Sequence, residues 1–393
     1  MPFNEEKLGT AIVIPGGTLQ LPLINLLREK GYTPFVLDGD KDAPAFAETS
    51  GYVVDINNHK ECWTLVSKLD DVRLVISNCS DAGQHLSAYL ANRLGLPSVS
   101  EECSGLTRDK FLMKKALVNG GIQTAKFNLI DSNAALLNVD WDRPKVVKPT
   151  IGSGSNAVRY LEKKASLSKY CFDFDKNSYL IEDFITGNEI AIDGFVIDGN
   201  VHTLAISEKF RSELPFMLDT KLYIRGYLQK QDHELSELAK NVTVAMHMDN
   251  CAFHIEVIKS SSGYYVVECA SRGAGFHVFN KIIPRVTGID TMATLLNLAI
   301  NEPFLVKNQE RVSSVALLEF PEFDTGTVLT INRPTELGED QSFVLLFDIG
   351  DRLSPVTSGA TRHSYAIIFS ETSVGCDRQL AKLVQEILVT TGK

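Results

Sequence analysis

A pair of glutamates lies on two neighbouring segments that have the composition of β-strands. The runs FHIEVI (253–258) and YYVVEC (264–269) are rich in β-branched and aromatic residues, and SSG (261–263) between them suits a three-residue hairpin loop. That loop predicts a register in which Glu256 and Glu268 lie directly opposite each other on one face. The register contains three facing pairs: Ser260 with Tyr264, Ile258 with Val266, and Glu256 with Glu268.

Two carboxylates that face each other across strands repel, so a cation is expected between them. Arg272 follows Glu268 by four residues, and His254 shares the face of Glu256. Mg²⁺ suits this pair because it prefers oxygen ligands and is usually shared with substrate phosphates, which the planar fork of Arg272 could also contact. The alternative is an ordinary strand pair in which one glutamate faces solvent and the other pairs with a lysine.

A candidate site for phosphates follows the apolar strand KVVKP (145–149). Lys148 leads into TIGSGSN (150–156), where backbone N–H groups of glycine and serine can approach an anion closely. The segment lacks the spacing of a P-loop, and a plain hairpin loop would also explain its composition. The candidate phosphate-contacting residues are Lys148, Gly152, Ser153, Gly154 and Ser155.

Three more polar residues could belong to a nucleotide site. Lys110 lies early in an expected helix, where an ordinary solvated lysine is the alternative. Glu182 and Glu189 flank the turn ITG (185–187), and a carboxylate there suits the two hydroxyls of a ribose, while backbone groups along a strand edge can recognise a base. Both glutamates would equally suit ordinary strand positions.

The composition restricts the classes of protein to which the chain can belong. Its 393 residues carry a formal net charge of −10 and no dense basic stripe, which argues against a protein that binds nucleic-acid backbones. The seven cysteines lack the spacing of a zinc site, and no run approaches the roughly 18 to 20 apolar residues of a membrane span. These features predict a cytoplasmic protein with neither a membrane nor a nucleic acid as partner.

The pattern of apolar runs predicts three units, at 1–105, 106–309 and 310–393. The first alternates short apolar strands with helical segments, which is typical of a parallel α/β sheet. The second consists mainly of antiparallel hairpins with helices near 233–247 and 289–300, and the third closes with a helix in CDRQLAKLVQEILVT. The fold class is therefore α/β combined with α+β.

The second unit is expected to begin with a helix. In TRDKFLMKKALVNGGI, Thr107 and the acidic residue after it suit the start of the helix, and Gly120 with Gly121 suits its end. The strands expected along the first two units lie at 11–15, 34–38, 52–56, 74–77, 126–130, 145–149, 157–161, 179–185, 189–206, 253–258 and 264–269.

Taken in chain order, five segments resemble the ATP-grasp superfamily: DK (109–110), KP followed by GSGS (148–155), IEDFITGNE (181–189), HIE (254–256) and ECASR (268–272). The ordered set is more specific than any one member. The flanking units resemble that family's preceding parallel α/β domain and its small C-terminal lid, with a two-lobed ATP-grasp unit of antiparallel sheets between them. Within the superfamily, the chain is most similar to the amino-acid ligases and carbamoyl-phosphate-synthase-like enzymes.

The resemblance implies an ATP- and Mg²⁺-dependent carboxylate–amine ligase, with Mn²⁺ as a substitute metal. Such an enzyme forms an amide-type C–N bond through an acyl phosphate and releases ADP and phosphate. Ala270 departs from the pattern, because many relatives carry a metal-binding Asn there, so a second magnesium is less secure than the first. The implied roles are phosphate contacts from Lys110, Lys148 and the loop 152–156; adenine contacts from Glu182, Phe184 and Ile185; a ribose contact from Glu189; metal ligands in Glu256 and Glu268; and catalysis by Arg272 and Lys148.

The substrates are expected to be ATP, a small carboxylate and a small amine, and the expected assembly is a homodimer. The PGGT turn (15–18) could face the substrate, although a tight turn after the first strand explains it equally well. Candidate substrate-contacting residues, each of which would also suit an ordinary surface or core position, are His202, Glu208, Lys209, Arg211, Arg225 and His277.

Other functions remain open at this level. Within the superfamily, the alternatives are a purine-biosynthesis-like enzyme, a carbamoyl-phosphate-synthase-like enzyme or an ATP-binding protein without catalysis. Outside it, IPGGT (14–18) and Asp38 could indicate a dinucleotide-binding oxidoreductase. Its glycine fingerprint is incomplete, because Leu19 and Leu21 occupy positions that require glycine.

Overall fold

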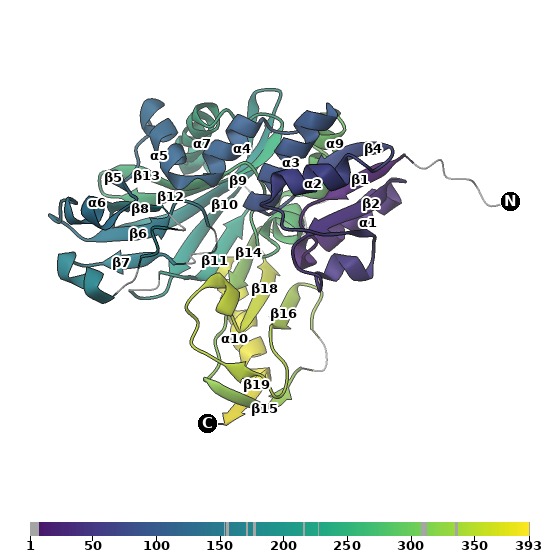
Figure 1. Ribbon diagram of the computed structural model, residues 1–393. Helices are drawn as coiled ribbons and strands as arrows, with labels where there is room; N and C mark the ends of the chain where they lie inside the picture. Colours follow the sequence, from purple (N-terminus) through teal and green to yellow (C-terminus); the bar gives the residue numbers. More distant parts are fainter. Residues whose placement is uncertain are drawn as a thin grey trace.

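The structure of the protein is a computed structural model that describes residues 8–152, 154, 157–169, 172–175, 178–214, 217–226, 228–307, 313–334 and 337–392. Its described strands form four sheets, the longest with eight strands. In Figure 1 this long sheet lies at the centre, with the N-terminal unit on the right, a four-stranded sheet on the left and the C-terminal strands below. No described helix is both long and apolar enough to cross a membrane.

The N-terminal unit is a parallel sheet with strand order β3-β2-β1-β4, which confirms the predicted α/β class. The apolar residues of β1 and the inner parts of β2 and β4 are buried because helices pack on both faces, whereas Val53 on the edge strand β3 is exposed. The elements are β1 (Thr10–Val13), α1 (Leu21–Glu29), β2 (Thr33–Asp38), β3 (Gly51–Val53), α2 (His59–Val66), β4 (Val72–Ile76) and α3 (Asp81–Leu94).

Two helices stand where the sequence predicted one. α4 (Glu101–Arg108) and α5 (Lys110–Asn119) meet at Asp109, whose carboxylate accepts hydrogen bonds from the backbone N–H groups of Phe111 and Leu112. The predicted cap at Thr107 is therefore wrong, because the extended backbone and short carboxylate of Asp109 provide the N-cap. This boundary makes Lys110 the first residue of α5.

A small antiparallel lobe follows α5, with strand order β5-β8-β6-β7. Its apolar residues form a core of their own, separate from the core of the long sheet. The glycine-containing segment predicted to bind phosphates leaves the end of β6. The elements are β5 (Phe127–Ile130), α6 (Asn133–Leu137), β6 (Lys145–Pro149), β7 (Arg159–Leu161) and β8 (Tyr179–Asp183).

The long sheet has the order β13-β12-β9-β10-β11-β14-β18-β16, and all its pairs are antiparallel. The expected run 189–206 divides into two strands at Asp198 and Gly199, whose positive φ angles of 47° and 72° suit a tight hairpin turn. The elements up to residue 300 are β9 (Asn188–Ile197), β10 (Asn200–Arg211), β11 (Asp219–Arg225), α7 (His233–Ala245), β12 (Cys251–Ser260), β13 (Gly263–Ala270), α8 (Ile283–Thr287) and α9 (Thr291–Ala299).

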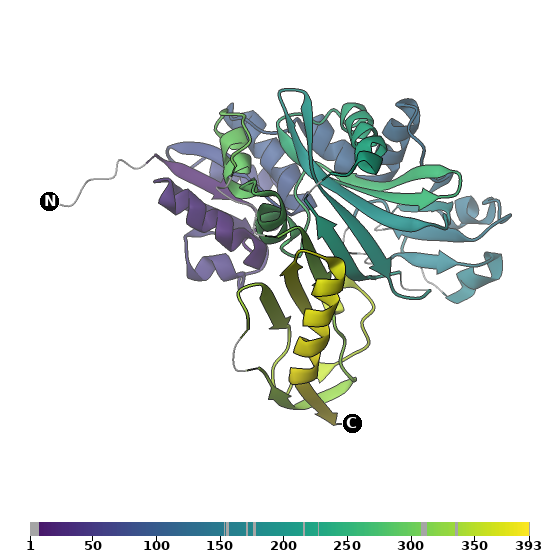
Figure 2. The ribbon, with the colours of Figure 1, turned by 180° about the vertical axis from the view of Figure 1, so that it is seen from behind.

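The C-terminal residues continue the long sheet and add a three-stranded sheet with order β17-β15-β19. α10 (Ser373–Glu386) packs on β14 and β18, as the rear view shows (Figure 2). The helix predicted to reach residue 390 ends earlier, because the β-branched segment after it pairs with β15. The strands are β14 (Val315–Glu319), β15 (Gly326–Asn332), β16 (Gln341–Leu345), β17 (Arg352–Leu353), β18 (Ser364–Ser370) and β19 (Leu388–Gly392).

The β12–β13 hairpin keeps the predicted pairing of the two glutamates but reaches it differently. Glu256 lies opposite Glu268, as expected, whereas Ser260 faces Gly263 and Ile258 faces Tyr265, so the two other predicted pairs are wrong. The loop contains two residues instead of three, which shifts the register by one. A β-bulge at Val267 then restores the facing glutamates.

Candidate functional site

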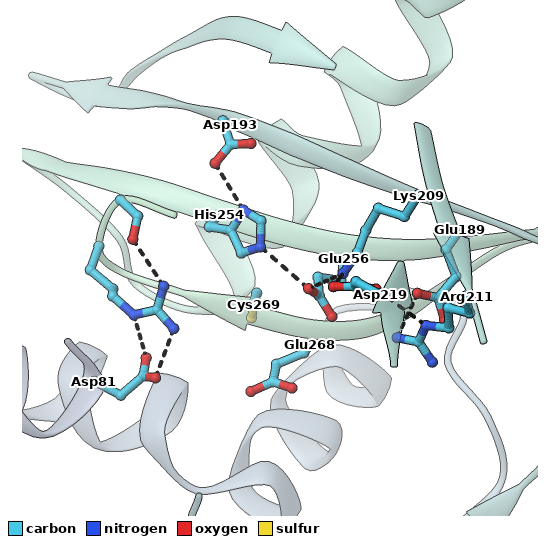
Figure 3. Close-up of polar contacts among 12 residues, drawn as sticks. Asp81, Glu189, Asp193, Lys209, Arg211, Asp219, His254, Glu256, Glu268 and Cys269 are labelled. Atoms are coloured by element: carbon cyan, nitrogen blue, oxygen red, sulfur yellow. Dashed lines mark hydrogen bonds and ion pairs between the residues drawn. The ribbon is translucent and has the colours of Figure 1, made fainter. Parts of the chain in front are cut away.

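The facing glutamates are each paired with a lysine from another element. Nζ of Lys209, on β10, lies 2.6 Å from Oε1 of Glu256, and Nζ of Lys110, at the start of α5, lies 3.2 Å from Oε1 of Glu268. Burial alone would raise the pKa of Glu256, but Lys209 and the neighbouring His254 hold this pKa well below its usual range. Glu256 is therefore held as an anion directly opposite Glu268 on the hairpin (Figure 3).

The donor set of this pair fits a magnesium ion that is shared with a nucleotide. Within the described part of the chain, both polar contacts of Glu256 go to Oε1, which leaves Oε2 for a ligand. Glu268 lies directly opposite it. No cluster of three or more His, Cys, Asp or Glu side chains suited to a metal occurs among the described residues. Two carboxylates alone suit Mg²⁺ that takes its other ligands from phosphates and water.

His254 connects Glu256 to a buried carboxylate. Its Nδ1 lies 2.8 Å from Oδ1 of Asp193 on β9, and its Nε2 lies 3.4 Å from Oε1 of Glu256 (Figure 3). Burial would lower the pKa of His254, but the two carboxylates outweigh it and raise the pKa to about 9. A protonated His254 donates to both partners and so orients the Glu256 carboxylate.

A second cluster places Glu182 between two buried lysines. Its carboxylate oxygens lie 2.7 Å from Nζ of Lys114 and 2.7 Å from Nζ of Lys148. Burial would raise the pKa of Glu182, but the two cations lower it to about 2. Lys114 was not among the predicted site residues, although Lys110 and Lys114 lie one helical turn apart and so share a face of α5.

Glu189 belongs to a third cluster, which lines the same region. Its Oε2 lies 2.5 Å from Nη2 of Arg211, and Arg211 Nε lies 3.6 Å from Oδ1 of Asp219 on β11. Lys209, two residues before Arg211 on β10, lies 3.0 Å from the other oxygen of Asp219. The cluster therefore presents two cations from one face of a strand.

These clusters line a cavity of about 480 Å³ between the small lobe and the long sheet. Most of the residues assigned to nucleotide binding meet here, although the sequence separates them by up to 158 positions, from Lys110 to Glu268. Ser153 and Ser155 lie outside the described residues. The predicted residues that line the cavity are Lys110, Lys148, Gly152, Gly154, Glu182, Phe184, Ile185, Glu189, Glu256 and Glu268.

A second cavity, of about 690 Å³, adjoins the first. It is bounded by the N-terminal unit, the β12–β13 hairpin and the C-terminal strands, and its wall includes Thr18 of the PGGT turn. The residues that line both cavities mark their junction: Gly154, Lys209, Arg211, Glu256 and Glu268. A group transferred from a ligand in one cavity to a ligand in the other would pass the facing glutamates.

Arg272 lines the second cavity and pairs with a residue that the sequence did not reveal. Its Nε and Nη2 lie 2.8 and 2.7 Å from the two carboxylate oxygens of Asp81, the first residue of α3. This bidentate pair fixes the plane of the guanidinium beside Glu268. The two residues are 191 positions apart, and no local pattern around Asp81 signals the contact.

The predicted substrate-contacting residues divide into two groups. Lys209, Arg211 and His277 line one or both cavities. The other three residues line neither: Arg225 pairs with Asp232 at 2.5 and 2.7 Å, and His202 and Glu208 lie elsewhere on β10.

The turn that suggested a dinucleotide site has a local explanation. Oδ2 of Asp38 accepts a hydrogen bond of 2.7 Å from the backbone N–H of Gly16, within the PGGT turn. This carboxylate therefore holds the turn itself. Thr18 and Leu19 of the same turn region face the second cavity instead.

Comparison with known proteins agrees with this geometry. The ATP-grasp domain family matches residues 141–279. Dapdiamide A synthase of Enterobacter agglomerans is 23% identical over 299 residues, which cover 69% of this chain and 68% of that protein. D-alanine–D-alanine ligase of Pediococcus pentosaceus is 26% identical over 176 residues, which cover 42% of this chain and 49% of that protein. The crystal structure of L-amino acid ligase from Bacillus licheniformis superposes with a TM-score of 0.81 at 18% identity and covers 99% of this chain and 100% of that one.

These similarities define the class: residues 141–279 match the ATP-grasp domain family, and the chain has the fold of the ATP-grasp enzymes. Within the superfamily, its match is to the carboxylate–amine ligase branch, which includes ligases of amino acids. The aligned region spans about half the length of the first two curated relatives, 49% and 53%.

Proposed function

We propose that this protein is an ATP-dependent ligase that joins a small carboxylate to an amine and releases ADP and phosphate. The observation that carries this proposal is the junction of the two cavities at Glu256 and Glu268. One cavity has the lysines and glycines suited to a nucleotide, and the other has room for a second ligand beside Arg272. Curated relatives that carry ligase names support the same reaction class.

In the first cavity, the chain's own residues would hold ATP by charge and position. Lys110 and Lys148 would neutralise the phosphates, and Glu182 would keep Lys148 and Lys114 in place. Phe184 and Ile185 provide apolar surface for the base. Glu256 and Glu268 would hold Mg²⁺, which when bound supplies charge neutralisation at the phosphates.

The proposed reaction has two steps. An oxygen of the substrate carboxylate attacks the γ-phosphorus of ATP, the bond from that phosphorus to ADP breaks, and an acyl phosphate forms. The amine nitrogen then attacks the acyl carbon, loses a proton and displaces inorganic phosphate. Neither step requires a covalent enzyme nucleophile, so positioning and charge neutralisation suffice.

Arg272 would act at both steps because it lies next to Glu268 in the wall of the second cavity. Its guanidinium can stabilise the phosphoryl group in transfer and the oxyanion of the tetrahedral intermediate. The bidentate contact with Asp81 keeps this cation in a fixed orientation before the substrates bind.

Screening pairs of small carboxylates and amines with MgATP tests the proposal. The expected result is pair-dependent release of ADP and phosphate, together with a product whose mass equals the two substrates minus water. MnATP is the first alternative if MgATP gives low rates. ATP binding without turnover for any carboxylate would instead favour a non-catalytic ATP-binding protein.

A further inference from the structure

Arg362 is a partly buried cation in the wall of the second cavity, and it has no hydrogen-bond or ion-pair partner among the residues that the structure describes. It lies between the short 3-10 turn Gly359–Thr361 and β18. Its guanidinium carbon lies 3.4 Å from the ring centroid of Phe320 and 5.3 Å from that of Phe276. Among the described residues it makes neither a hydrogen bond nor an ion pair, and its Nε is buried without a partner.

The two other arginines that line the cavities each have a carboxylate partner. Arg272 pairs with Asp81 and Arg211 pairs with Glu189. Asp219 and Glu322 act on Arg362 only through longer-range attraction, and Asp219 is already within 3.0 Å of Lys209. Burial lowers the pKa of Arg362 to about 10, which still leaves it protonated at neutral pH. A partly buried cation whose Nε is shielded from water and has no described partner is costly, so an anionic ligand would complete this site.

The surface beside Arg362 is apolar. It is formed by side chains of β11, β14 and β16, of the residues that directly follow β14 and β16, and of the segment after Arg272, namely Leu222, Phe276, Leu318, Phe320, Val344 and Leu346. The guanidinium lies over the Phe320 ring of this surface, and Arg362 is itself part of the cavity wall. The combination suits a ligand with a carboxylate next to an apolar group.

The backbone at Phe276 and His277 indicates that this wall is built for a ligand. Both residues have left-handed φ angles, 47° and 62°, which are rare for side chains of this size. A π-helix, Val278–Ile282, follows at once. Such strained segments persist only where the surrounding structure holds them, and they concentrate at functional sites.

The position of Arg362 indicates which substrate it would bind. The reacting carboxylate must lie at the junction, among residues that line both cavities, whereas Arg362 lines the second cavity alone. A carboxylate at Arg362 therefore belongs to the molecule that supplies the amine.

We infer that the amine substrate is an apolar amino acid whose own carboxylate pairs with Arg362. Its side chain lies against the wall formed by Phe276 and Phe320, and its amino group points to the junction. The product is then a dipeptide-type amide with a free terminal carboxylate. This inference rests on the proposed ligase function and adds the class of the acceptor.

Hydroxylamine separates the two proposals because it captures an acyl phosphate without needing a carboxylate of its own. Each of the twenty L-amino acids is first tested as donor with MgATP and hydroxylamine, and the hydroxamate is measured. With the best donor, four acceptors are then compared as matched pairs: L-phenylalanine with phenethylamine, and L-leucine with 3-methylbutylamine. We expect the amino acids to be used and the amines that lack the carboxylate to be poor acceptors.

Arg362→Met removes the charge and keeps an unbranched side chain. It should lower kcat/KM for the amino-acid acceptor about 10- to 100-fold and leave hydroxamate formation unchanged. Arg362→Lys should recover part of the loss. Arg93→Met is the matched control, because Arg93 also lies 3.4 Å from a ring centroid, that of Tyr89, but lies outside both cavities.

Three results would overturn the inference while leaving the ligase function intact. These are equal use of amines with and without the carboxylate, rejection of both apolar amino acids as acceptors, and a loss of hydroxamate formation in Arg362→Met as large as the loss of peptide. The absence of hydroxamate with every donor would overturn the proposed function, and the inference with it. Thermal unfolding of each variant checks that the fold is retained.

Discussion

Glu268 faces Glu256 across the hairpin, and its Oε1 lies 3.2 Å from Nζ of Lys110. Because Glu268 lines both cavities, its carboxylate lies at their junction. Replacing it with glutamine keeps its size and removes one proposed metal ligand. Glu268→Gln should therefore lower Mg²⁺-dependent ADP release by about 100-fold or more. A coupled assay of ADP over a range of Mg²⁺ concentrations measures the effect.

The matched control is Glu237→Gln on α7, which removes a glutamate that is exposed to solvent. Its turnover should equal that of the wild type. If Glu268→Gln turns over at nearly the wild-type rate, the metal assignment is wrong.

Glu182 should make stability depend on pH. Its pKa of about 2 in the folded protein lies below the ordinary value of 4.5, since Lys114 and Lys148 outweigh the effect of burial. The charged form therefore stabilises the fold above about pH 4.5, and this contribution is lost as the pH falls toward 2. Its size is on the order of 3 kcal/mol in the free energy of unfolding.

Urea unfolding of the wild type and Glu182→Gln at pH 7, 4 and 3 tests this expectation. The difference between the two proteins should be largest at pH 7 and should shrink as the pH falls. A difference that stays constant over this range would contradict the assignment of Glu182 as the group responsible.

Between elements, the contact of α3 with the end of β13 depends on the pair Asp81 and Arg272. Asp81→Asn leaves the Arg272 side chain, which is only 14% exposed, without its counter-ion, which should cost about 3 kcal/mol of unfolding free energy and also lower turnover. Asp71→Asn is the matched control, because Asp71 pairs with Arg73 at 2.6 Å on the surface, where about 1 kcal/mol or less is expected.

Chemical unfolding and ADP release measured on both variants distinguish the two sites. Equal destabilisation by Asp81→Asn and Asp71→Asn would show that the buried pair contributes no more than a surface pair. Unchanged turnover in Asp81→Asn would show that Arg272 keeps its orientation without it.

The same elements show what the sequence can predict. The facing of Glu256 and Glu268 follows from a local hairpin, and the structure confirms it. The bulge at Val267 was not predicted, because the composition of the loop segment suits a two-residue loop nearly as well as a three-residue loop. Only tertiary packing decides between the two. The cap at Asp109 was assigned to Thr107 because both residue types favour that position.

Contacts between distant elements could not be predicted in this way. Asp81 and Arg272 come together because two units pack against each other, and no sequence pattern around either residue predicts this contact. Lys114 had a local signal in its spacing from Lys110, but its burial beside Glu182 depends on the small lobe. Local patterns therefore predicted residues that meet in the first cavity, whereas the walls of the second cavity depend on the whole fold.

Across the whole molecule, the N-terminal unit and the long sheet share one core. Leu23 and Ile24 of α1 belong to the same buried cluster as Phe195 of β9 and Ile224 of β11. The small lobe has a core of its own, and the first cavity lies between this lobe and the long sheet. A ligand in that cavity should therefore stabilise the small lobe more than any other part.

The non-hydrolysable analogue AMP-PNP with Mg²⁺ should raise the melting temperature and slow hydrogen exchange in β6 and β8. Both strands carry residues of the first cavity, Lys148 and Glu182, while Glu256 and Glu268 face them from the long sheet. At a ligand concentration 100 times Kd, the added stability is about 2.7 kcal/mol. NADH at the same concentration is the control, because the Asp38 carboxylate is occupied by the PGGT turn and offers no ribose site. Protection confined to β1 and β2, or an equal shift with NADH, would place the nucleotide in the N-terminal unit and contradict the assignment of the first cavity.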